Sequence, residues 1–277
     1  MERNSTILIL SLPLAGLIIF ASLAGLLSPG FYTNETPDWQ IQCVGQDFID
    51  LFLLVPVFLI ASYFAWRNKR TALLIWEGCV VFILYTFLIY CFDVHFNRLF
   101  IIYCFILGLS FYSCLYFIWS PMRESFSAIA PGHRILNITT IYFFIIASLF
   151  YALWLSEILP AIMHNQIPGN LDGMGLPTNP VHVIDLSVFL PGIFITAIFM
   201  MKRKPLGLLM APVLLVFFVL MDLTIGWLSV IMKWKGMGTD VSLSFVMMIL
   251  AIVSTTLLIQ YLATCRLSVR PLSTKVN

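Results

Sequence analysis

Long apolar segments alternate with short polar connections along the whole chain. Each segment holds about 20 residues, enough for a helix to cross the ~30 Å hydrocarbon core of a bilayer at ~1.5 Å per residue. The pattern therefore predicts membrane-spanning helices rather than strands or a soluble core. There are eight such segments, at about residues 6–28, 48–66, 71–92, 99–119, 135–159, 182–201, 206–232 and 241–265.

The first segment has a second interpretation, as a cleaved signal peptide. It follows a short basic start, and Ala21 and Ala24 are small residues of the kind found at cleavage sites. Its apolar run of 23 residues exceeds the ~7–15 residues of a signal-peptide core. We therefore predict that it is retained as a helix.

The positions of the basic residues predict how the helices are oriented. Of the 15 Lys and Arg, twelve lie at the chain ends or in the connections at 67–70, 120–134 and 202–205. Because Lys and Arg accumulate on the cytoplasmic side of membrane proteins, both termini are expected to be cytoplasmic. The three on the predicted outer side are Arg98, Lys233 and Lys235.

Composition agrees with a membrane protein and excludes other classes. Hydrophobic residues make up 61% of the chain and charged residues 10%, against about 25% charged residues in soluble domains. No basic patch is interleaved with aromatic residues, so the lipid bilayer is an expected partner and nucleic acid is not. The six cysteines show no zinc-type spacing. Cys43 and Cys91 should both lie near the outer surface, either paired or as free thiols.

Part of the chain is repeated. A shift of 135 positions places residues 47–69 on residues 182–204 with seven identities in 23 ungapped positions. Apolar composition alone explains some of these matches, but not readily the Asp, Pro and Lys together. These polar and proline matches are Asp50 with Asp185, Pro56 with Pro191, and Lys69 with Lys204.

The duplication predicts an architecture. Four spans return a chain to the side of the membrane on which it started, so two four-helix repeats would be parallel and related by a pseudo-twofold axis along the membrane normal. We predict an all-α integral membrane protein of eight transmembrane helices. Residues 1–119 and 135–277 would form the two repeats, and residues 120–134 a cytoplasmic connection.

Three motifs resemble a family of bacterial multi-pass inner membrane proteins over most of residues 40–215. They are Val44-Gly45-Gln46-Asp47, Phe92-Asp93-Val94-His95-Phe96-Asn97-Arg98-Leu99-Phe100 and Gly175-Leu176-Pro177-Thr178-Asn179-Pro180-Val181-His182-Val183-Ile184-Asp185-Leu186. The resemblance implies a protein of the bacterial inner (plasma) membrane. It implies no particular activity and assigns no functional residue.

Ionisable residues inside the predicted spans identify candidate sites, because each costs at least ~2.5–3.5 kcal/mol to insert. Asn179 followed by Pro180 predicts a helix N-cap with proline at the first helical position. Asp185 would then lie about 9 Å beyond the cap, where stabilisation by the helix dipole has faded. His182 shares its helix face. Capping therefore explains Asn179 but does not explain Asp185.

The repeat offers a partner face for these residues. Asp47 and Asp50 occupy the equivalent face of the second helix. If the two faces meet near the axis, three carboxylates and an imidazole converge at the outer ends of the second and sixth helices. They would bind a cation, a proton or a divalent metal, with His182 and Asp185 as metal ligands. Alternatively, each acid bonds to a neighbouring helix or loop and only fixes the fold.

Other polar residues are further candidates. Glu157, near the outer end of the fifth helix, either completes a His/Asp/Glu cluster with His182 and Asp185 or is solvated at the interface. Asp222 is a lone carboxylate deep in the seventh span, with a structural or a functional role. A polar outer turn supplies second-rank candidates, although such turns are usually only solvated; these are Asp93, His95 and Asn97.

These residues favour a transporter or channel for a small solute or ion, because parallel repeats occur in transporters and intramembrane acids can carry protons. The alternative is an intramembrane enzyme, a metal-dependent hydrolase or a redox protein, that uses His182, Asp185 and Glu157. Only four His are present and none shows metal-ligand spacing, which counts against the enzyme. A divalent metal is the one cofactor that the residues indicate. A third hypothesis is a non-catalytic membrane assembly subunit.

Overall fold

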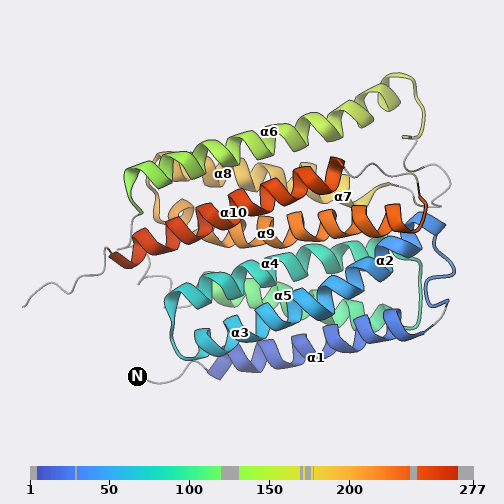
Figure 1. Cartoon of the computed structure of the whole chain (residues 1–277), viewed down its shortest axis with the longest axis horizontal. Helices are drawn as coiled ribbons and strands as arrows, with labels where there is room; N and C mark the ends of the chain where they lie inside the picture. The colour runs from blue at the N-terminus through green and yellow to red at the C-terminus, as the bar shows by residue number, and fades with distance from the viewer. Residues whose placement is uncertain are drawn as a thin grey trace, which may run out of the picture.

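The chain folds into a bundle of membrane-spanning helices (Figure 1). A computed structural model describes residues 5–28, 30–119, 131–168, 171, 176, 178–237 and 242–267. Within these residues the secondary structure is helical, without strands. Eight segments of the described chain are long and apolar enough to cross a membrane, which confirms the predicted fold class. They are Ser5–Leu27, Pro37–Trp66, Arg70–Phe92, Phe100–Trp119, His133–Met163, Pro180–Met201, Pro205–Trp234 and Ser242–Cys265.

Two of the eight segments are composite, because a short π-helix interrupts each of them. The second segment consists of α2 (Pro37–Ile49), the π-helix η1 (Asp50–Leu54) and α3 (Val55–Trp66). The sixth consists of α7 (Pro180–Ile184), the π-helix η3 (Asp185–Phe189) and α8 (Leu190–Met201). The others are α1 (Ser5–Leu27), α4 (Arg70–Phe92), α5 (Phe100–Trp119), α6 (His133–Met163), α9 (Pro205–Trp234) and α10 (Ser242–Leu267).

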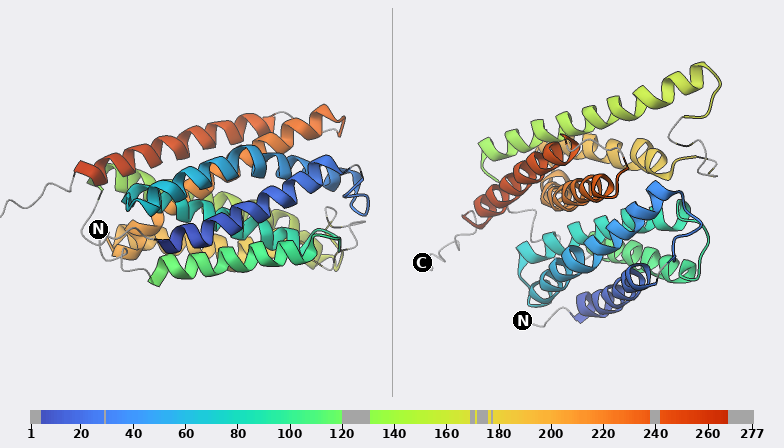
Figure 2. Two further views of the ribbon diagram at one scale, coloured as in Figure 1. Left: turned by 90° about the horizontal axis from the view of Figure 1, so that it is seen from below. Right: turned by 45° about the vertical axis from the view of Figure 1, so that its right-hand side comes forward.

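The bundle has two ends of different character. The start of α1 and the end of α10 lie at the same end, which we call the terminal end (Figures 1 and 2). The connections from α1 to α2 and from α4 to α5 lie at the opposite end, which we call the loop end (Figure 1). The cytoplasmic location of the terminal end stays a prediction. Residues 120–130 of the predicted cytoplasmic connection lie outside the described residues.

Two helices extend beyond the apolar segments that predicted them. The second segment begins at Pro37 instead of about residue 48, because Thr36 caps it and accepts a hydrogen bond from the backbone N–H of Trp39 at 3.4 Å. Proline at the first helical position adds to this signal. The first turns of α2 are amphipathic, so hydropathy alone does not detect them. Likewise α6 continues through Pro160 to Met163.

The two predicted halves lie side by side and meet along α4 and α9 (Figures 1 and 2). A Cβ atom added to Gly78 would lie 2.4 Å from Cβ of Val216 and 2.9 Å from the carbonyl oxygen of Val213, so only glycine allows this close approach. Next to it, the rings of Phe82 and Phe217 are 6.3 Å apart. Gly78 and Val213, and likewise Phe82 and Phe217, correspond under the shift of 135 positions.

Local backbone geometry recurs at the matched positions of the duplication. Each π-helix begins at a repeated aspartate, Asp50 or Asp185, whose carbonyl oxygen accepts the N–H of the residue five positions later. Pro56 and Pro191 follow. Proline lacks an N–H and its ring clashes with the carbonyl four residues before it, a conflict that a wide turn accommodates. These matches support the duplication, while the overall parallel repeat stays a prediction.

The contact between α4 and α9 generates the first prediction. Replacing Gly78 with Ala should destabilise the protein by about 1–3 kcal/mol, because the added methyl group overpacks the helix contact. Unfolding by SDS titration in detergent micelles measures this. The matched control is Gly16→Ala in α1, where an added Cβ meets no atom within 4 Å. Equal stability of the two variants would contradict the close packing.

Candidate functional site

Asp185 owes its position to the capped start of α7. The Asn179 side chain accepts hydrogen bonds from the backbone N–H groups of Val181 and His182 at 2.9 and 3.3 Å, and Pro180 occupies the first helical position. This confirms the predicted cap. Asp185 is the first residue after α7, so its carboxylate lies well beyond the cap and inside the bundle.

The Asp185 carboxylate joins helices of both halves. It is 8% exposed. The Tyr85 hydroxyl of α4 donates a hydrogen bond to Oδ1 at 3.0 Å, and the Trp154 indole N–H of α6 donates one to Oδ2 at 2.8 Å. The indole N–H can only donate, so the carboxylate accepts here. Each carboxylate oxygen can accept more than one hydrogen bond, so acceptor capacity remains after these two contacts.

A cavity of about 390 Å³ lies beside Asp185, between helices of both halves. Its polar lining includes Gln46, Asp185 and Asp222, together with Thr86 and Thr224. Most of the remaining wall is apolar or aromatic. The aromatic lining residues are Trp39, Phe82, Tyr85, Tyr142, Phe150, Trp154, Phe189, Phe217 and Phe218. The structure therefore places two of the predicted acids, from the sixth and seventh spans, around one cavity.

Asp222 lies deeper in the bundle than Asp185. It is 7% exposed and accepts a hydrogen bond from the Ser254 hydroxyl at 3.3 Å. Ser254 also bonds to the Tyr142 hydroxyl at 2.7 Å, so α6, α9 and α10 meet at this point. By helical rise, Asp222 is ~18 Å from the loop end of α9 and Asp185 ~7.5 Å from the start of α7.

Asp47 and Asp50 do not line this cavity. Asp47 is 2% exposed and accepts hydrogen bonds from the hydroxyls of Tyr32 and Tyr90 at 2.7 and 3.1 Å. Oδ1 of Asp50 accepts from the Gln46 amide at 2.8 Å. These partners all belong to the first half, so the hydrogen bonds do not link Asp47 or Asp50 to Asp185. The predicted convergence of the two faces at the axis is not seen in these contacts.

His182 contacts Glu157, as the cluster hypothesis expected. Their Nε2 and Oε2 atoms are 3.7 Å apart, and the His182 ring packs against Trp154 with ring centroids 4.5 Å apart. Asp185, however, bonds to Tyr85 and Trp154. Among the described residues, no group of three or more His, Cys, Asp or Glu could hold a metal ion. The predicted pair of metal ligands, His182 and Asp185, therefore has no third ligand of these types in that part of the chain.

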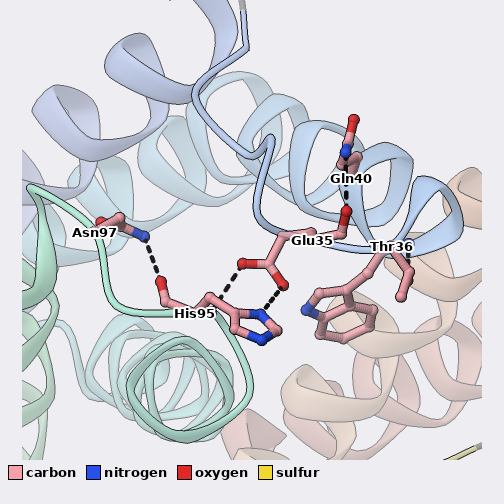
Figure 3. Close-up of polar contacts among 6 residues, drawn as sticks. Glu35, Thr36, Gln40, His95 and Asn97 are labelled. Atoms are coloured by element: carbon pink, nitrogen blue, oxygen red, sulfur yellow. Dashed lines mark hydrogen bonds and ion pairs between the residues drawn. The ribbon is translucent and has the colours of Figure 1, made fainter. Parts of the chain in front are cut away.

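Two of the second-rank candidates, His95 and Asn97, take part in polar contacts between loops (Figure 3). Glu35 accepts a hydrogen bond from the backbone N–H of His95 at 2.8 Å, and its other carboxylate oxygen lies 2.8 Å from Nδ1 of the His95 ring. Gln40 donates to the Glu35 carbonyl, and Asn97 donates to the His95 carbonyl. These bonds hold the loop before α2 against the loop after α4. They support a structural role for His95 and Asn97.

Asp93 is buried beside this ion pair and is 6% exposed. The pKa of its carboxyl is raised from 3.8 to about 6, chiefly by burial and also by the nearby Glu35 carboxylate, whereas His95 lowers it. The shift follows from the loss of solvent and the proximity of a second carboxylate.

Cys43 and Cys91 are both free thiols, as are the other four cysteines, all of which lie in the described part of the chain.

Sequence analysis did not identify the partners of the acids. Tyr85 and Trp154 hold Asp185, Tyr32 and Tyr90 hold Asp47, and Gln46 holds Asp50. The chain contains 10 Tyr and 7 Trp, and no local pattern separates these from the rest. Only Gln46 lies at helical spacing from its acid, four residues before Asp50, where a hydrogen bond on one helix face can be anticipated.

Comparison of the chain with protein-family models, curated proteins and solved structures gives no match. The functional interpretation therefore depends on the geometry of the site.

The burial of Asp93 generates a pH prediction. Because its pKa rises from 3.8 to about 6 on folding, ionisation of Asp93 destabilises the folded state, and the destabilisation is complete above about pH 6. Asp93→Asn should therefore melt at a higher temperature than the wild type above about pH 6, and the difference should shrink toward about pH 4. Thermal unfolding across this pH range measures it.

The matched control for this measurement is Asp38→Asn, which changes an exposed carboxylate near the same end of the bundle. A melting difference for Asp93→Asn that is the same at every pH would contradict the assignment.

Proposed function

We propose that this membrane protein is a carrier that moves a small solute or ion across the bilayer through the cavity beside Asp185. The observation that carries the proposal is the position of this carboxylate. It is buried within a span, lines a cavity of about 390 Å³, and takes its two hydrogen bonds from α4 and α6, helices of different halves. Movement of one half against the other would therefore change both the cavity and the bonds of Asp185. Carriers built from two repeats open by such movements.

The contrast with Asp47 supports a functional role for Asp185. Both acids are buried in the bundle, and each receives two hydrogen bonds. Asp47 does not line the cavity and lies between two tyrosines of its own half, so a structural role accounts for it. Asp185 faces open volume together with Asp222. Buried ionisable residues that line a cavity within the membrane commonly mark ion or substrate pathways.

The enzyme hypothesis has less support from the geometry. Nε2 of His182 and Oε2 of Glu157 are 3.7 Å apart, which is longer than the roughly 2.6–3.2 Å of a hydrogen-bonded acid–base pair. The third residue of that hypothesis, Asp185, is bonded to Tyr85 and Trp154 and lines the cavity instead. A non-catalytic assembly subunit has no evident need for a cavity with two buried carboxylates.

Accessibility of the cavity from both sides of the membrane tests the carrier proposal without knowledge of the solute. Thr86→Cys and Thr224→Cys introduce single thiols into the cavity lining of a variant whose six native cysteines are replaced. We expect a membrane-impermeant maleimide to label each thiol from either side in sealed vesicles of known orientation, because a carrier exposes its site alternately. The control is Ala211→Cys, which is 0% exposed and does not line the cavity, and should resist labelling from both sides.

Two outcomes of the labelling experiment would contradict the proposal. Labelling from one side only would indicate the binding pocket of an enzyme or a receptor. Protection of both threonine positions from both sides, as for Ala211→Cys, would indicate a closed structural core.

A further inference from the structure

The charges around the cavity favour one sign of ligand. Asp185 and Asp222 line it, and no Lys, Arg or His is among the described residues that form its lining. An anionic ligand would meet two acidic groups without a compensating cation. A cationic ligand would supply the missing positive charge. Because charges interact more strongly in a protein interior than in water, this difference is large at such a site.

The hydrogen bonds of the two acids lead to the same conclusion. The partners of Asp185 are a hydroxyl and an indole N–H, and the partner of Asp222 is the Ser254 hydroxyl at 3.3 Å. All of them are neutral groups. The carboxylates therefore retain capacity to accept hydrogen bonds or to pair with a positive charge from a ligand in the cavity.

The aromatic lining indicates the rest of the ligand. Nine of the 27 lining residues are aromatic. The rings of Tyr85 and Phe189 lie 4.9 Å apart, and those of Phe189 and Phe217 4.5 Å apart, so they form a continuous wall near Asp185. Aromatic faces attract organic cations and bury apolar surface. A small inorganic cation would require several converging ligands, and no group of three or more His, Cys, Asp or Glu among the described residues could hold a metal ion.

The cavity also has the size for an organic molecule. Its volume of about 390 Å³ falls within the range of roughly 300–1,000 Å³ typical of small-molecule sites. Both carboxylates line this volume together with the aromatic wall. A positive group can therefore pair with either acid while the apolar body stays against the rings.

We infer that the cavity binds a lipophilic organic cation, whose positive group pairs with Asp185 or Asp222 and whose apolar body packs against the aromatic wall. The claim that this cation is the transported solute depends on the carrier proposal. The claim that the cavity binds it depends on the cavity alone.

A pair of ions of similar size and opposite charge tests the inference. Tetraphenylphosphonium and tetraphenylborate are each equilibrated by dialysis with the full chain in nanodiscs, beside empty nanodiscs. We expect saturable binding of tetraphenylphosphonium, and no binding of tetraphenylborate beyond its uptake by empty nanodiscs. Because each acid supplies part of the attraction, Asp185→Asn and Asp222→Asn should each weaken cation binding about tenfold. The matched control, Asp38→Asn, should leave binding unchanged.

Several results would overturn the inference. They are saturable binding of both ions, binding of neither, preference for the anion, or unchanged cation binding in both cavity variants. The comparison of the two ions uses only the wild-type protein, so the test stands even where a variant does not fold. Cation binding together with labelling of the cavity from one side would reject the carrier and keep the ligand. Labelling from both sides without cation binding would keep the carrier proposal and reject the organic cation as its ligand.

Discussion

A carboxylate inside the hydrocarbon part of a membrane requires partners that offset its loss of water. Asp185 finds them on two other helices, in the Tyr85 hydroxyl of α4 and the Trp154 indole of α6. One side chain thus connects three spans and both halves of the bundle. Asp47 meets the same requirement within the first half, through Tyr32 and Tyr90. The two acids differ in that only Asp185 also lines a cavity.

The close contact of α4 with α9 places this cavity between the halves, and the halves are unequal around it. Under the shift of 135 positions Tyr85 corresponds to Leu220, which has no hydroxyl. Asp185 therefore has a donor from the opposite half, whereas Asp50 bonds to Gln46 of its own segment. The shared π-helical turns show how similar the two segments are in backbone. Their side chains nevertheless differ, because Asp185 lines the cavity whereas Asp47 and Asp50 do not. A carrier with a single central site is compatible with that asymmetry.

Sequence patterns predicted the eight spans, the cap at Asn179 and the position of Asp185 inside a span, because hydropathy and capping are local or compositional properties. They did not predict the start of α2 at Pro37, since its first turns are amphipathic. They also missed the donors to Asp185, which lie 100 and 31 residues away in the chain and depend on how the helices rotate and pack. For the same reason the repeat alone did not identify the partners of Asp47 and Asp50, whose hydrogen bonds stay within the first half.

The hydrogen bond between Tyr85 and Asp185 is the most direct test of this organisation. We would measure the free energy of unfolding of Tyr85→Phe, Asp185→Asn and the double variant by SDS titration in mixed micelles. If the bond connects the halves as described, the two single effects should couple by about 1–3 kcal/mol, because a charged group buried among apolar side chains gains more from a hydrogen bond than an exposed one. Effects that add within about 0.5 kcal/mol would show that the two side chains act independently, and would contradict the central role of Asp185.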